Sequence, residues 1–189
     1  MEDKVAKLTF FGMMISLDGY INDAKGNFSW GQIDSDVHEH ANAETKQIGT
    51  MILGRRMYET LVSWETYSGD TDFEAEFAEI WRNLDKVVVS KTLKQAKSRR
   101  TSIVPEIDLD EMRRLKASAA KDLAVAGPTL ASTYLAAGLI DEIGIYFVPV
   151  VVGAGTPMFQ QVNQTLRLER IQELAFANGV VFVRYRMRN

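Results

Sequence analysis

Cysteine is absent from this chain, and histidine and proline are scarce. The 189 residues include no cysteine, two histidines and four prolines. The absence of cysteine excludes disulfides, thiolate metal sites and a catalytic thiol. The two histidines, His38 and His40, stand two residues apart in an expected helix, so they point to different faces and would make a poor chelate. We therefore expect no metal site and place both rings on a solvated helix face.

The chain also lacks a strong charge of one sign and a long apolar run. Its formal net charge of −3 argues against non-specific binding to nucleic acid, which needs a basic surface. No run approaches the ~20 apolar residues of a membrane span, and the charged start, Met1 to Lys7, does not resemble a signal peptide. With 46% hydrophobic residues and no linker, residues 1–189 are expected to form one cytoplasmic domain without nucleic-acid or membrane partners.

Apolar and amphipathic segments alternate along the chain. The pattern predicts strands over 8–15, 50–53, 86–90, 123–126 and 143–152, and helices over 35–47, 72–81, 108–118 and from Pro128 to about Gly138. Near the end, two further apolar segments flank Asn178-Gly179, which is typical of a two-residue hairpin turn. This order predicts an α/β fold with a mostly parallel sheet, helices on both faces and an antiparallel carboxyl-terminal hairpin.

The segment Asp122 to Gly155 is the most informative about function. Its first apolar run ends at Gly127-Pro128-Thr129, where a strand gives way to a helix. The first N–H groups of such a helix point outward and can hold a phosphate. The structural alternative stays open: Gly127 then serves only to allow a positive φ, and Pro128 only to start the helix.

Four expected parallel strands end in small or basic turns, and ligands of open α/β sheets bind at that edge. The turns are 16–19, 54–56, 90–92 and 127–129. Arg55 and Arg56 offer planar forks for phosphate, while Ser90 and Lys91 add a hydroxyl and a point charge. An ordinary helix start would also explain the arginines, although cations oppose the helix dipole there. Several separate anion sites indicate a dinucleotide, and NADPH is the natural candidate.

At these motifs the chain resembles the dihydrofolate reductase superfamily. The resemblance rests on the order of SLDGYI, Trp30, ILGRRMYE, KVVVSKTL and VAGPTLASTYLAAGLIDEI. It is most similar to the reductase domain of the bifunctional riboflavin-biosynthesis deaminase/reductases and their stand-alone relatives. The resemblance implies a three-layer α/β/α fold, NADPH as hydride donor, a substrate bound in the central cleft and, commonly, a homodimer.

The resemblance also implies which residues contact ligands. Asp18 matches the family's loop that faces substrate and nicotinamide. The positions that match the cofactor-contacting segments are Trp30, Gly54, Arg55, Arg56, Ser90, Lys91, Gly127, Pro128, Thr129 and Leu130.

Two positions depart from the family pattern. Riboflavin reductases usually carry a substrate-contacting Glu where this chain has Val125, and both branches commonly carry Thr where it has Met57. We nominate Asp18 and Asp36 as candidate proton donors, although Asp18 could instead stabilise its turn and Asp36 its helix dipole.

The leading interpretation is an NADPH-dependent reductase of a small pteridine- or pyrimidine-like heterocycle. The alternatives are a catalytically silent NADP(H)-binding protein and an authentic dihydrofolate reductase.

Overall fold

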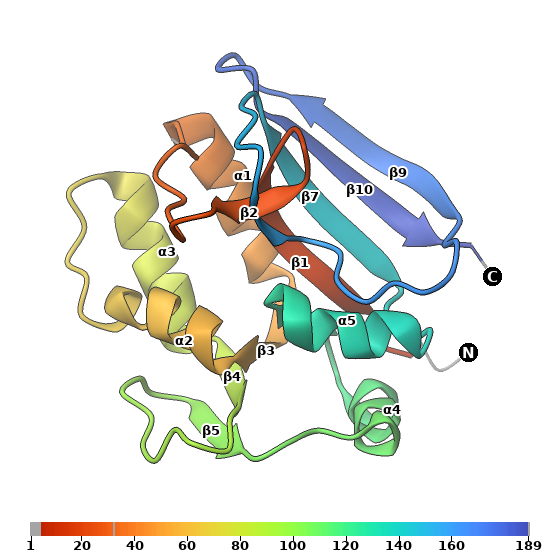
Figure 1. Ribbon diagram of the computed structural model, residues 1–189. Helices are drawn as coiled ribbons and strands as arrows, with labels where there is room; N and C mark the ends of the chain where they lie inside the picture. Colours follow the sequence, from red (N-terminus) through yellow and green to blue (C-terminus); the bar gives the residue numbers. More distant parts are fainter. Residues whose placement is uncertain (1–4, 32, 189) are drawn as a thin grey trace.

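The computed structural model describes residues 5–31 and 33–188 (Figure 1). Residues 1–4 of the charged start, which is not expected to be a signal peptide, therefore lie outside the described residues. The helices are α1 (Ser35–Lys46), α2 (Arg55–Leu61), the 3-10 turn η1 (Val62–Glu65), α3 (Asp72–Asn83), α4 (Leu109–Ser118) and α5 (Pro128–Ala136). The strands are β1 (Leu8–Ser16), β2 (Tyr20–Asp23), β3 (Ile48–Gly54), β4 (Asp85–Val89), β5 (Thr101–Val104), β6 (Asp122–Ala126), β7 (Glu142–Val148), β8 (Gly155–Pro157), β9 (Leu168–Ala175) and β10 (Val181–Met187).

Eight of these strands form one sheet in the order β5-β4-β3-β6-β1-β7-β10-β9. The pairs from β5 to β7 are all parallel, whereas β10 runs antiparallel to both β7 and β9. The remaining strands, β2 and β8, form a separate antiparallel pair. The predicted mostly parallel sheet with an antiparallel carboxyl-terminal hairpin is confirmed.

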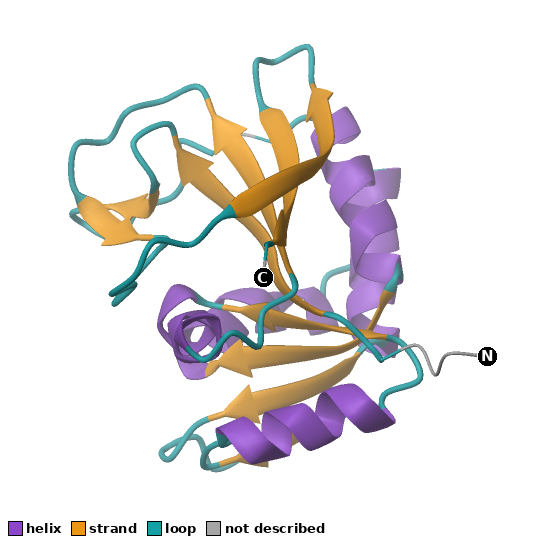
Figure 2. Ribbon diagram, turned by 90° about the vertical axis from the view of Figure 1, so that its right-hand side faces the viewer, coloured by secondary structure: helices purple, strands orange, loops and turns teal. Residues whose placement is uncertain are grey.

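Helices cover the sheet from both sides, as Figures 1 and 2 show. Alternate residues of β6 illustrate why, because Leu123 and Val125 pack with α4 and α5, while Ala124 and Ala126 pack on the opposite face with α2 and α3. Farther along the sheet, Val37 of α1 packs on β7 and β10. The central strands are therefore apolar on both faces, as a parallel sheet inside three layers requires.

The structure departs most from the sequence prediction in the segment after β7 and in three short strands. The strand expected over 143–152 ends at Val148, because Pro149 has no N–H to donate to a neighbouring strand. The strands β2, β5 and β8 were not predicted, because at three or four residues they are too short to show a period. None of the described helices is long and apolar enough to cross a membrane.

The two histidines of α1 are not on a solvated face, which corrects the sequence prediction. His38 lies among the rings of Trp64, Phe73 and Phe77, with centroid distances of 5.0 to 6.0 Å. On another side of the helix, Nδ1 of His40 lies 2.7 Å from the hydroxyl of Tyr146. Burial lowers the pKa of both rings, and the charge of Arg184 lowers that of His40 further. The histidines do point to different faces, but each face is covered by an aromatic cluster.

Candidate functional site

The four turns singled out in the sequence come together at one edge of the sheet. They follow β4, β3, β6 and β1, which are consecutive neighbours with the same direction, so their carboxyl ends lie side by side. A methyl group at Gly127 would lie 3.7 Å from Cβ of Met57, which places the turn after β6 against α2. This edge is the place where open α/β sheets bind ligands.

The turns after β3 and β4 are joined by Arg55. Its Nη1 donates to the Thr92 hydroxyl at 2.7 Å, and its Nε donates to Glu59 at 2.7 Å. Arg56 is exposed and takes part in no ion pair with any described residue. A Cβ at Gly54 would meet no atom within 4 Å, so this glycine faces open space. The arrangement leaves room and one unpaired cation beside the amino end of α2.

Ser90 and Lys91 both contact other residues of the protein. The Ser90 hydroxyl accepts the N–H groups of Thr92 and Leu93 at 3.2 and 3.0 Å, which stabilises the turn. Lys91 is exposed and pairs with Glu106 at 3.4 Å. Contacts this exposed are weak, so Lys91 remains available to an anion, whereas Ser90 already has a structural role.

The turn after β6 has the geometry that the sequence left open. Gly127 has a φ of 107°, and Pro128 occupies the first turn of α5. The Thr129 hydroxyl donates to Oε1 of Gln160 at 3.1 Å, and Leu130 packs against the core. The first N–H groups of α5 point to the edge where the other turns meet. The positive φ at Gly127 and the helix start at Pro128 are thus compatible with an anion-binding role of the same turn.

Asp18 fastens the turn after β1 to the loop after β7. Its carboxylate accepts the N–H groups of Val152 at 3.2 Å and Gly153 at 2.8 Å. The Ser16 hydroxyl contributes most, and these two N–H groups less, to holding the pKa of the Asp18 carboxyl below its ordinary value. A carboxylate kept ionised in this way is a poor proton donor. The geometry favours the structural alternative for Asp18, with partners in a distant loop.

Asp36 and Trp30 lie where α1 begins, at the same end of the sheet. Asp36 is exposed in the first turn of α1, and its Oδ1 accepts the Ser35 hydroxyl at 3.2 Å. The Trp30 indole N–H donates to the Asn27 carbonyl at 3.0 Å, and the ring packs against the cluster formed by α1, β7 and β10. Trp30 is therefore anchored on the α1 side of the sheet, opposite the face that α5 covers.

One element of this edge was not found from the sequence, namely the segment that contains β8. It pairs with β2, buries Met158 completely and continues to Phe159, which is 42% exposed beside Phe10. Gln160 then contacts Thr129. Gly155 is the sequence signal that could have indicated a close approach, because a Cβ there would overlap the Asn22 carbonyl.

The two residues that depart from the family pattern, Val125 and Met57, both pack against other side chains of the protein. Val125 is fully buried in the core beneath α5, and Met57 is partly buried between the clusters on the two faces. Neither position offers a polar atom to a ligand. Among the described residues, no group of three or more His, Cys, Asp or Glu side chains could hold a metal ion.

Comparison with known proteins identifies the family. The model of the RibD C-terminal domain matches residues 7–182. This chain belongs to the RibD C-terminal domain family. Over 174 residues it is 29% identical to the uncharacterized protein YyaP of Bacillus subtilis (strain 168), covering 92% of this chain and 91% of that protein.

Two solved structures are similar in fold to this RibD C-terminal domain. A protein from Shewanella sp. PV-4, provisionally described as a riboflavin biosynthesis protein, superposes with a TM-score of 0.73 at 21% identity, over 97% of this chain and 99% of that one. Dihydrofolate reductase from Enterococcus faecalis, in complex with NADP(H) and RAB-propyl, superposes with a TM-score of 0.61 at 12% identity, over 98% and 97%. The protein thus has the dihydrofolate reductase fold.

Proposed function

We propose that this protein is an NADPH-dependent reductase that transfers hydride to a small pteridine- or pyrimidine-like heterocycle. The observation that carries the proposal is the convergence of four turns at one sheet edge, with Gly54 open to solvent and Arg56 unpaired among the described residues beside it. Family membership supports the same reaction class.

The residues present fit a dinucleotide. Arg55 is a fork already oriented by Glu59 and Thr92, and Arg56 and Lys91 supply further positive charge, which suits the additional phosphate of NADPH. The first N–H groups of α5 would hold the pyrophosphate. When bound, the cofactor supplies the hydride. The protein binds and orients it, and Trp30 and the β2–β8 segment exclude water.

The proton needs a separate source. Asp18 is tied to Val152 and Gly153 with its pKa lowered, so we assign it to holding the site together. Asp36, whose carboxylate is exposed at the same end of the sheet, remains the candidate donor, directly or through a water molecule. A homodimer is proposed on the family resemblance alone.

The phosphate assignment is tested by calorimetric titration with NADPH and NADH. The double variant Arg55→Ala/Arg56→Ala should weaken NADPH binding by tenfold or more, about 1.4 kcal/mol, and leave NADH nearly unchanged. The matched control is Arg113→Ala/Arg114→Ala, an exposed arginine pair on α4. Equal losses for both cofactors would contradict the phosphate site, and a wild-type protein that binds neither would contradict the cofactor.

A second candidate is a catalytically silent NADP(H)-binding protein. It is favoured by Val125, which is fully buried at the position where riboflavin reductases usually carry a substrate-contacting Glu. Tight NADPH binding without oxidation across a panel of pteridines and pyrimidines would select this candidate. Authentic dihydrofolate reductase is the third, and tight methotrexate binding would identify it.

A further inference from the structure

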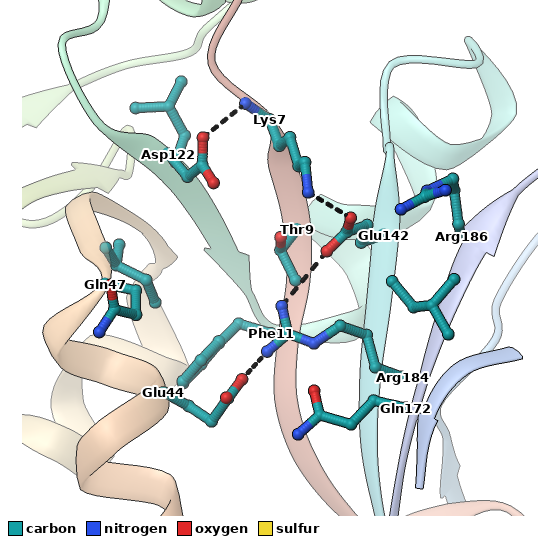
Figure 3. Close-up of a pocket in the computed structure, with 13 residues that line it drawn as sticks. Lys7, Thr9, Phe11, Glu44, Gln47, Asp122, Glu142, Gln172, Arg184 and Arg186 are labelled. Carbon is teal, nitrogen blue, oxygen red and sulfur yellow. Dashed lines mark hydrogen bonds and ion pairs between the residues drawn. The ribbon is translucent and has the colours of Figure 1, made fainter.

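A cavity of about 350 Å³ lies at the opposite edge of the sheet from the four turns. It opens at the amino ends of β1, β6 and β7, between the last turn of α1 and the β9–β10 hairpin (Figure 3). Since β1 has nine residues, roughly 26 Å separates the two edges. The cavity is lined by Lys7, Thr9, Phe11, Glu44, Gln47, Ile48, Asp122, Leu123, Glu142, Ile171, Gln172, Arg184 and Arg186.

A network of ion pairs forms the floor of the cavity. The side chain of Glu142 is only 3% exposed, and its two oxygens are taken by Nζ of Lys7 at 2.6 Å and Nη1 of Arg184 at 3.2 Å. Nη2 of Arg184 pairs in turn with Glu44 of α1 (Figure 3). Arg184, Arg186 and Arg188 alternate in the sequence, which is typical of the solvent face of a strand. Arg184 does not follow this pattern, because two carboxylates far away in the chain hold it in a largely buried position.

Two arginines of the cavity have donors without a partner among the described residues. Nε of Arg184 is buried and has no hydrogen-bond partner among the described residues, which costs about 1–3 kcal/mol while it stays unsatisfied. Arg186, two residues along the same face of β10, is exposed and takes part in no ion pair within residues 5–31 and 33–188. Both point to a ligand that brings oxygen acceptors and negative charge.

The acidic side chains of the cavity do not oppose such a ligand strongly. Glu142 and Glu44 are neutralised by the network, and Oδ1 of Asp122 accepts the Lys7 backbone N–H at 3.0 Å. Figure 3 shows Asp122 on the far side of β1 from Arg186. The corner around Arg186 is therefore the positive part of the cavity.

The cavity also has apolar walls. Phe11 of β1 and Ile171 of β9 contribute them. A volume of about 350 Å³ exceeds what an inorganic ion fills and lies within the range of small-molecule sites. The occupant should thus combine an oxyanion with an apolar body.

We propose that this cavity binds a small organic anion, a carboxylate or phosphate monoester. Its oxyanion lies against Arg186 and reaches the Nε–H of Arg184 after a small shift of that side chain, and its apolar part rests on Phe11 and Ile171. This site is separate from the proposed cofactor edge and does not depend on the proposed reductase activity.

The test is amide NMR titration of the full chain with benzoate, with its uncharged isostere benzamide, and with inorganic phosphate. Benzoate should shift amides of β1, β9 and β10 at millimolar concentration, and benzamide should not. Arg186→Gln should weaken benzoate binding by tenfold or more, while Arg188→Gln, an exposed arginine just beyond β10, should leave it unchanged. Arg184→Lys, which keeps the charge but removes Nε, should also weaken it.

Any of three titration results would overturn the proposal. They are no shift with benzoate or phosphate, equal shifts with benzamide, and benzoate binding unaffected by Arg186→Gln. Binding of phosphate more tightly than benzoate would assign the phosphate monoester within the proposed class. A concentration-dependent dimer whose formation protects β9 and β10 from exchange and excludes benzoate would make a second copy of the chain the occupant, and would also overturn it.

Discussion

At the residue scale, several polar side chains have partners far away in the chain, which sequence reasoning could not supply. Asp18 accepts N–H groups from Val152 and Gly153, and Arg184 pairs with Glu44 and Glu142. A carboxylate in a turn and an arginine in an alternating strand both suggest local or solvated roles. Their actual roles depend on contacts more than 40 residues away in sequence.

The role of Asp18 has a pH signature. Its pKa is lowered from 3.8 in the folded protein, so its contribution to stability is present above about pH 4 and is lost as pH falls through the lowered pKa. Asp18→Asn should therefore be less stable than the wild type at about pH 7, with the difference vanishing near pH 2. Urea unfolding at both pH values measures it. Asp70→Asn, in an exposed loop, is the control; a difference that persists in acid would contradict the role.

His38 and His40 offer a matched pair of substitutions. Nδ1 of His38 is buried without a partner among the described residues, so His38→Phe should raise the free energy of unfolding by about 1 kcal/mol at neutral pH. His40→Phe should lower it by about 1–3 kcal/mol, because the Tyr146 hydroxyl, in a residue 2% exposed, loses its partner.

The pH dependence of His38 follows from its lowered pKa. The neutral ring contributes stability above the unfolded value of 6.5, and this is lost as pH falls through the lower folded pKa. His38→Phe should therefore flatten the decline of stability below about pH 6.5. Thermal unfolding between neutral and mildly acidic pH measures this, and a Phe variant as acid-sensitive as the wild type would contradict it.

At the element scale, the β2–β8 pair is the part of the site most dependent on one residue. A methyl group at Gly155 would overlap the Asn22 carbonyl, so Gly155→Ala must push the two strands apart. We expect a loss of about 2 kcal/mol or more and faster amide exchange over residues 20–23. Gly138→Ala is the control, since the added methyl meets no atom within 4 Å and only its φ of 66° costs about 1 kcal/mol. Equal losses of stability in the two variants would show that the overlap with the Asn22 carbonyl does not cause the destabilisation.

The long elements were predictable because their signals are local. The apolar runs of β1, β3, β6 and β7 and the Asn178-Gly179 turn each specify structure within ten residues. From the four strands β1, β3, β4 and β6, the convergence of the turns at one edge followed directly. The segment from Pro149 to Gln160 did not, because its course is fixed by pairing with β2 and by contact with α5.

At the scale of the whole molecule, the sheet carries a proposed site at each of its two edges. The carboxyl edge carries the turns of the proposed cofactor site, and the amino edge carries the charged cavity. The first could be predicted from the sequence, since parallel strands place their following turns together. The second could not, because no spacing in the sequence shows that Lys7, Glu44, Glu142 and Arg184 meet.

The central position of β1 has a consequence for the synthesis of the protein. This strand is synthesised before the other described strands, but its neighbours in the sheet are β6 and β7, and Asp122 of β6 is made 115 residues after Lys7. At about 5–20 residues per second, this delay is on the order of 6 to 23 seconds. During that time the apolar strand has no sheet to join, so the nascent chain exposes to chaperones the segment that ends at the centre of the finished sheet.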